Sequence, residues 1–274
     1  FYLKEVTRYS HKLILPDGGH VTRCPMSQFN MLRDLIEVRA AIAPINEVES
    51  NDLHKTVKLM GNYFKMFCMP DGHYAFFNGG ALIGKDDISQ TKKRLGYNAK
   101  SFELANNSGY ARINQKNINL IIDVGNKEIL NSNLLKNNKA SIGSIEYYFK
   151  NKKIVTNLGD LSDLNKNISM LFSTAAHSTM SIDDRNNLDL TGQRKFDLLK
   201  IKSMQNKIGT LIETQHDGYK HNFGISHKRT IFIPQKGNDL RGEDEISTFK
   251  NIGIIPNTAF IRFHLNPLIE TFKL

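Results

Sequence analysis

Cysteine is scarce in this sequence, and long hydrophobic runs are missing. The 274 residues include 2 cysteines, Cys24 and Cys68, which lie in separate segments without CxxC spacing. This usage excludes a zinc ribbon and a disulfide-stapled scaffold. No stretch approaches the roughly 18 uninterrupted apolar residues that a membrane span requires. We therefore expect a globular protein with no membrane span.

The N-terminal residues FYLKEVTRYSHKL lack an initiator methionine. They also lack the basic, apolar and small-residue order of a signal peptide. We therefore expect that the chain is a piece of a longer protein and that its own sequence is silent on export.

Positive charge is in excess, with a formal net charge of +10. The densest basic stretches are short and scattered: TKKR (91–94), KNNK (136–139) and KNKK (150–153). They are rich in asparagine rather than aromatic residues, so we do not expect a nucleic-acid partner. A cleft for an acidic polymer is the better use of this charge, because Lys and Arg attract carboxylate and sulfate groups as they attract phosphate.

Helical periodicity dominates the first hundred residues. One amphipathic helix is predicted from Pro25 to a point before Pro44, and a second from an N-cap at Ser50 or Asn51. Two turns with the same Pro-Asp-Gly chemistry each follow a helix and indicate a repeating helical hairpin. They are LPDGGH (15–20) and MPDGHYAFFNGG (69–80).

Short β-prone runs follow from Tyr110 onward, with Asn, Gly and Asp at the joints between them. Such short joints favour antiparallel hairpins and leave no room for crossover helices. We therefore expect a β-sandwich, with the change from helices to strands between residues 101 and 109. Alternation around His177 predicts a sandwich strand that ends in a turn at Asp183 and Asp184.

Three stretches are unusually polar for strand ends. They are STAAHST (173–179), HDGY (216–219) followed by ISHKR (225–229), and DLRGEDE (239–245). Singly, each has a purely structural explanation: a hydrogen-bonded core histidine, an Asp-Gly turn and a salt-bridged exposed hairpin.

Together and in this order, these stretches resemble a known family. SGYARI, SIEYYF, IVTNLG, STAAHSTMSIDD, HDGY, SHKRTIFI, DLRGEDEI and FIRFHLNP are similar to the C-terminal β-domain of the heparinase II/III-like family. LPDGGHVTRCP and DGHYAFFNGG resemble the last hairpins of the helical domain that precedes it. The resemblance implies an α+β multidomain protein. Residues 1–105 would be the end of an (α/α) toroid, and residues 106–274 an antiparallel β-sandwich.

The resemblance also implies a polysaccharide lyase of the periplasm or cell envelope, with an acidic polysaccharide or oligosaccharide as partner. Such enzymes cleave by β-elimination: they neutralise the uronate carboxylate, remove the C5 proton and protonate the leaving oxygen at C4. Small neighbours indicate that His177 faces the interface between the helical and β regions. The catalytic candidates are His177, His20 and Tyr219, and the substrate-binding candidates are Arg23, His216 and Arg241.

The sequence departs from the family pattern at two places. Zinc-containing relatives use two histidines and an aspartate, but Lys139 and Asn157 stand at two of these positions and leave only His177. We therefore expect no metal and no cofactor. A catalytic tyrosine that relatives carry after the DGG turn has no counterpart between His20 and Phe29. The alternative function is therefore a non-catalytic glycan-binding or cell-envelope protein that keeps the lyase scaffold.

Overall fold

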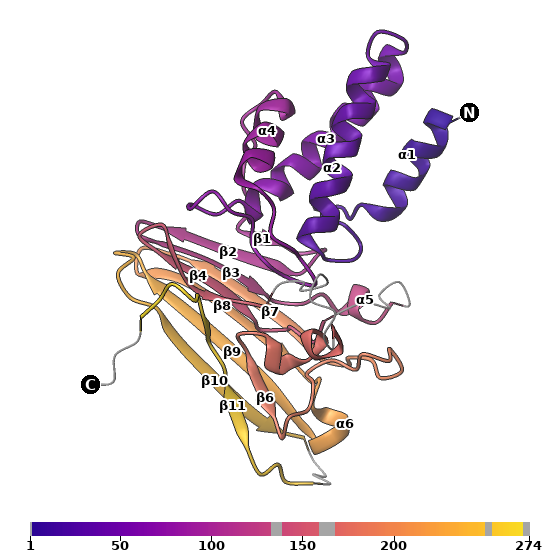
Figure 1. Cartoon of the computed structure of the whole chain (residues 1–274). Helices are drawn as coiled ribbons and strands as arrows, with labels where there is room; N and C mark the ends of the chain where they lie inside the picture. Colours follow the sequence, from indigo (N-terminus) through magenta and orange to yellow (C-terminus); the bar gives the residue numbers. More distant parts are fainter. Residues whose placement is uncertain (1, 133–138, 159–167, 250–253, 271–274) are drawn as a thin grey trace.

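Helices come first in the chain and antiparallel strands follow, as predicted (Figure 1). The computed structural model describes residues 2–132, 139–158, 168–249 and 254–270, so residues 136–138 of one basic stretch lie outside the described residues. In the described part of the chain, no helix is both long and apolar enough to span a membrane. The four main helices are α1 (Tyr2–Leu13), α2 (Pro25–Ile42), α3 (Glu47–Phe67) and α4 (Lys85–Leu95).

The helix starts follow local capping chemistry. Helix α2 has Pro25 in its first turn, as predicted, where the missing N–H costs no hydrogen bond. The predicted N-cap of α3 at Ser50 or Asn51 is wrong, because the side chain of Asn46 accepts a hydrogen bond from the Glu49 N–H at 3.2 Å. The cap therefore lies one turn earlier than hydrophobic spacing indicated.

The two Pro-Asp-Gly turns have the same geometry. In the first, Leu15 N donates to Gly19 O at 2.7 Å, and in the second Met69 N donates to His73 O at 2.9 Å. Gly18 and the equivalent glycine of the second turn, Gly72, have φ of 86° and 85°. Only glycine adopts this conformation freely, so the shared sequence explains the shared turn.

Within the described residues, the strands form three antiparallel sheets. The largest has the order β1-β2-β3-β4-β5-β12, the second β10-β9-β8-β7, and the third pairs β11 with β6. The strands of the largest sheet are β1 (Leu104–Ala105), β2 (Tyr110–Gln115), β3 (Ile118–Asp123), β4 (Ile145–Phe149), β5 (Lys152–Thr156) and β12 (His264–Leu265). The others are β6 (Met180–Ile182), β7 (Leu199–Gln205), β8 (Gly209–His216), β9 (Ile225–Pro234), β10 (Arg241–Thr248) and β11 (Ala259–Ile261). Short helices α5 (Lys127–Leu130) and α6 (Lys220–Phe223) lie in connections.

The central strand β3 is buried on both faces and joins two cores. Ile121 packs into the core that the helices form. Leu120 and Ile122 point to the opposite face and pack with Ile212 and Ile231 of the second sheet. The helices, the large sheet and the four-stranded sheet are thus three successive layers (Figure 1).

The predicted strand through STAAHST is wrong. Residues 168–172 and 174–176 form 3₁₀ helices, and the strand begins only at Met180. Asn186 and Thr174 explain the difference, because the Asn186 side chain accepts from Thr174 N and the Thr174 hydroxyl accepts from the next amide, Asn187 N, both at 2.9 Å. Such side-chain bonds compete with a strand ladder. The predicted turn is confirmed, since Asp183 and Asp184 have φ of 42° and 55°.

Candidate functional site

Arg23 lies at the junction between the helices and the large sheet. Its guanidinium pairs with the buried Asp123 carboxylate, and its Nε donates to Ser108 O at 2.6 Å. Its carbonyl accepts from the Tyr110 hydroxyl at 2.7 Å. Burial acts to lower the pKa of Arg23, but Asp123 outweighs it and the pKa is raised. Arg23 is therefore a buried, charged cross-link between the two parts of the chain.

His20 lies three residues earlier and is only half-buried. Its Nδ1 accepts a hydrogen bond from the Thr22 backbone N–H at 3.2 Å, so the proton of the neutral ring resides on Nε2. Burial lowers its pKa. His20 is thus a neutral imidazole whose Nε2 is available for proton transfer.

His177 is sealed inside the protein, with 1% of its surface exposed. Neither ring nitrogen makes a hydrogen bond of good geometry to a described residue. Burial, then the charges of Lys139 and His264, lower the pKa of His177 to about 3, against a smaller opposing effect of the Leu171 backbone. The ring is therefore neutral at physiological pH.

Lys139 and Asn157 are both buried, and the charge of Lys139 acts on His177. The side-chain oxygen Oδ1 of Asn157 accepts from Ser178 N at 3.1 Å, and its side-chain nitrogen Nδ2 donates to Phe76 O at 3.2 Å. An ammonium and an amide are poor zinc ligands. Within the described residues, no group of three or more His, Cys, Asp and Glu side chains is placed to hold a metal.

His216 belongs to a buried chain of polar side chains that crosses the four-stranded sheet. Its Nδ1 accepts from Gly218 N at 3.3 Å, so its Nε2–H donates to His227 Nδ1 at 3.2 Å. His227 Nε2–H in turn donates to Asp244 at 2.6 Å. Arg229 donates to both oxygens of the same carboxylate at 2.8 Å. Both ring nitrogens of His216 and of His227 thus take part in hydrogen bonds within the protein.

The pKa values of His216, His227 and Asp244 depend on their burial and on their contacts with one another and with Arg229. Burial, followed by the charges of His227 and Arg229, lowers the pKa of His216. Burial also lowers the pKa of His227 and outweighs its bond to Asp244. For Asp244 burial acts to raise the pKa, but the bonds from His227 and Arg229 outweigh it and hold the pKa below its usual range. Two neutral histidines therefore connect to one carboxylate–guanidinium pair.

Tyr219 lies beside His216, with the ring centroids 6.0 Å apart, and Arg241 lies on the edge strand β10. The buried Tyr219 hydroxyl donates to Met180 O at 2.8 Å, and burial raises its pKa. Arg241 is exposed at the start of β10 and pairs with Asp239 at 2.7 Å. The six predicted residues thus fall at the junction, around His177, in the four-stranded sheet and at its edge, rather than around one shared cavity.

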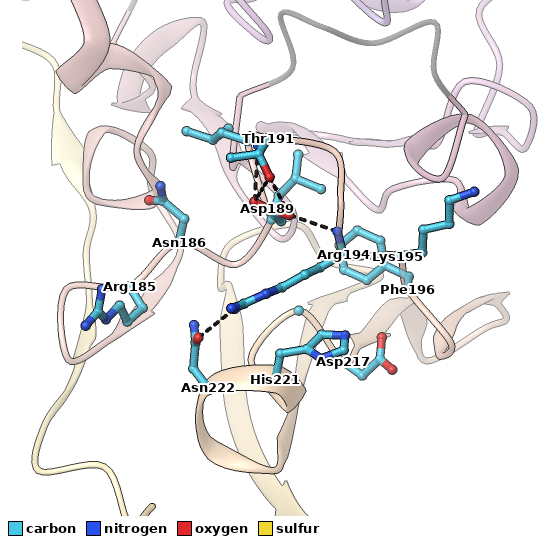
Figure 2. Close-up of a pocket in the computed structure, with 13 residues that line it drawn as sticks. Arg185, Asn186, Asp189, Thr191, Arg194, Lys195, Phe196, Asp217, His221 and Asn222 are labelled. Atoms are coloured by element: carbon cyan, nitrogen blue, oxygen red, sulfur yellow. Dashed lines mark hydrogen bonds between the residues drawn. The ribbon is translucent and has the colours of Figure 1, made fainter.

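Sequence reasoning missed His227, Arg229 and Asp244, although their motifs were noticed. The signal was present: alternation along β9 places positions 225, 227, 229, 231 and 233 on one buried face. Asp244 could be found only through strand pairing, because it lies directly opposite Arg229 in the β9–β10 register. A cavity whose lining residues come from the segments 185–196 and 217–222, without Tyr219, was also missed (Figure 2).

Comparison with known proteins gives a consistent result. The family model described as heparinase II/III-like, C-terminal, matches residues 98–272. "FtsZ-localized protein C" of Caulobacter vibrioides is 25% identical over 284 residues, which cover 97% of this chain and 48% of that protein. The chain thus spans about half the length of this curated relative.

Solved structures with a similar fold include heparinase III and a heparan sulfate lyase. The match to the crystal structure of heparinase III has a TM-score of 0.71 at 16% identity, and it covers 96% of this chain and 44% of the heparinase III chain. The match to the heparan sulfate lyase HepC from Pedobacter heparinus has a TM-score of 0.64 at 13% identity, and it covers 85% of this chain and 39% of the HepC chain. At these identities the likeness concerns the fold alone. Because the family model covers most of the sequence, from the end of the helical region to the last described strand, this chain belongs to the heparinase II/III-like family.

Proposed function

We propose that this protein is a non-catalytic member of its family, located in the cell envelope, that keeps the lyase scaffold and binds an acidic polysaccharide or oligosaccharide without cleaving it. One observation carries the proposal: two of the three candidate catalytic side chains, His177 and Tyr219, are buried inside the protein. His177 is neutral and sealed. The Tyr219 hydroxyl donates to a backbone carbonyl. A general base must contact the substrate.

The domain organisation is part of this proposal. Residues 1–105 are the C-terminal part of an (α/α) toroid, and residues 106–274 are the β-sandwich. The fold likeness to heparinase III over 96% of the chain supports this division. The layered packing of helices on two sheets supports it as well (Figure 1).

The curated relative supports a role other than catalysis. It aligns with 97% of this chain, and its name places it with FtsZ rather than with a glycan substrate. A binding protein without lyase activity fits both this name and the family scaffold. The excess positive charge supports an acidic ligand.

Lyase activity on a uronic-acid polymer is the second candidate function. His20 favours it, because its Nε2 carries a proton in the neutral ring and the side chain is partly exposed. In this alternative His20 is the general acid or base, and residues outside this chain neutralise the carboxylate.

The test uses the full-length protein and a panel of uronic-acid polymers. We expect polymer binding that weakens as salt rises, since exposed charge pairs are screened within roughly 10 Å at 0.1 M salt. We expect no rise in the ultraviolet absorbance of an unsaturated product. An absorbance rise that His20→Ala abolishes would establish the lyase instead.

A further inference from the structure

A cavity of about 500 Å³ opens between the loop of residues 185–196 and the segment of residues 217–222 (Figure 2). Its volume is in the range of small-ligand sites. None of the six residues predicted from the sequence lines it. It is therefore a site that motif reasoning did not find.

The two walls of the cavity are held together by close backbone packing. A Cβ atom on Gly218 would lie 1.9 Å from the Asn187 carbonyl oxygen, so only glycine fits there. The Asn187 side chain donates to Ile142 O at 2.8 Å, which ties this contact to the protein interior. The cavity is thus formed before any ligand binds.

The loop of the cavity is organised around Asp189. The Asp189 carboxylate accepts from the backbone N–H groups of Thr191, Gln193 and Arg194 at 2.8–3.1 Å. Arg194 Nη1 then donates to Asn222 Oδ1 at 2.9 Å. Figure 2 shows the Arg194 side chain between this loop and helix α6. The guanidinium is therefore positioned at the cavity, with further N–H donors to spare.

The charge of the cavity favours an anion. Arg185, Arg194 and Lys195 line it, against the two carboxylates of Asp189 and Asp217. Backbone N–H groups already compensate the Asp189 carboxylate, and hydrogen bonds from Arg194 and Thr191 hold its pKa low against the opposing effect of burial. Three cationic side chains therefore stand against two acidic ones, and backbone N–H groups of the loop already engage the Asp189 carboxylate.

The Asp217 carboxylate lines the cavity and has one oxygen without a hydrogen-bond donor among the described residues. Its Oδ2 accepts from Asp197 N at 3.2 Å, but its Oδ1 is buried and has no partner among the described residues. Only 4% of this residue is exposed. An unpaired buried acceptor costs about 1–3 kcal/mol. A ligand that brings a hydroxyl donor would satisfy it.

We infer that this cavity binds a hydroxylated carboxylate, specifically a uronic acid unit of an acidic glycan. The ligand carboxylate contacts Arg194 and Arg185, and a hydroxyl donates to Asp217 Oδ1. Leu188 and Phe196 supply an apolar surface for the carbon skeleton of the ring. This inference rests on the proposed function, because it names the place where the acidic ligand binds.

The experiment titrates full-length protein with D-glucuronate by ligand-observed NMR. Glucose, which has the hydroxyls without the charge, and cyclohexanecarboxylate, which has the charge without the hydroxyls, are the comparison probes. We expect glucuronate to bind at least about tenfold more tightly than either, because each lacks one charged or hydroxyl contact. Equal affinity for the three would overturn the inference.

Variants locate the binding. Arg194→Gln and Asp217→Ala are each expected to weaken glucuronate binding at least about tenfold. Arg33→Gln is the matched control, because it removes an exposed arginine of α2 that pairs with Asp87 outside the cavity. Circular dichroism checks that each variant is folded. Unchanged affinity in folded Arg194→Gln would overturn the inference.

The two proposals fail in different ways. Polymer binding that survives Arg194→Gln unchanged would refute the cavity and leave the non-catalytic function standing. Cleavage of the polymer, combined with glucuronate binding that Arg194→Gln weakens, would refute the non-catalytic function and leave the cavity standing.

Discussion

Replacing Asp244 by Asn tests whether the buried polar chain of the four-stranded sheet holds this region together. Asp244 accepts from His227 at 2.6 Å and from two nitrogens of Arg229 at 2.8 Å. Asn keeps the shape but removes the negative charge and places an NH₂ group against donors. The Arg229 guanidinium, 1% exposed, would then be a buried cation without its anion.

The expected loss in the free energy of unfolding is about 3–5 kcal/mol, the usual cost of breaking a buried ion pair by removing one partner. Asp239→Asn is the matched control. It removes the same charge from an ion pair with Arg241 near the start of the same strand, but that pair is exposed. An exposed pair contributes about 0–1 kcal/mol.

Urea unfolding of the wild type and both variants measures the difference. The wild-type carboxylate has a pKa below its usual range in the folded state. Its contribution is therefore complete above the unfolded pKa of about 3.9 and is lost as pH falls through the lower folded pKa. The gap between wild type and Asp244→Asn should close over this acidic window. A loss below about 1 kcal/mol at pH 7 would refute the reasoning.

Three further outcomes follow from the structure. The pKa of His177 is lowered to about 3 in the folded protein. The contribution of this residue to the free energy of unfolding should therefore fall by up to about 1.4 kcal/mol per pH unit as the pH drops below about 6.5. His177→Gln should remove this pH dependence in urea titrations, and an unchanged dependence would contradict the prediction. Gly218→Ala should unfold or severely destabilise the protein because its Cβ would clash with Asn187, whereas Gly80→Ala, whose nearest contact is an ordinary 3.5 Å, should lose less than about 1 kcal/mol in the same assay. Chelator-washed protein should contain no stoichiometric zinc by elemental analysis, because Lys139 lies beside His177 and repels a cation; one zinc per chain would show this to be wrong.

Periodicity and turn chemistry were sufficient for the order of the elements, because helices and hairpins are encoded locally. Helix α4 was missed, although Asp86 and Asp87 in its first turn, Lys92 and Lys93 in its last turn and Gly96 after it are typical helix-end signals. Its basic residues also form the charge cluster TKKR, which is a competing interpretation of the same stretch. The sequence therefore does contain the signals for this helix.

The site was less predictable, because its geometry depends on contacts between distant segments. The small and polar residues of STAAHST alternate as a strand would, but hydrogen bonds from Thr174 N to the Asn186 side chain and from Asn187 N to the Thr174 hydroxyl direct the chain into a 3₁₀ turn. Likewise, Asp217 and Arg194 share a cavity only because Gly218 packs against Asn187. No local pattern reports such a contact.

The ion pair between Arg23 and Asp123 has a consequence for how this chain can be divided. A cut at residue 105 follows the change from helices to strands, but it would leave Asp123 buried without its cation and Tyr110 without the carbonyl it bonds. The strand Ile118–Asp123 would also lose the helical layer over Ile121. Excising residues 106–274 should therefore yield an aggregation-prone fragment, and in the intact chain the helices and the sheets should unfold in a single cooperative transition.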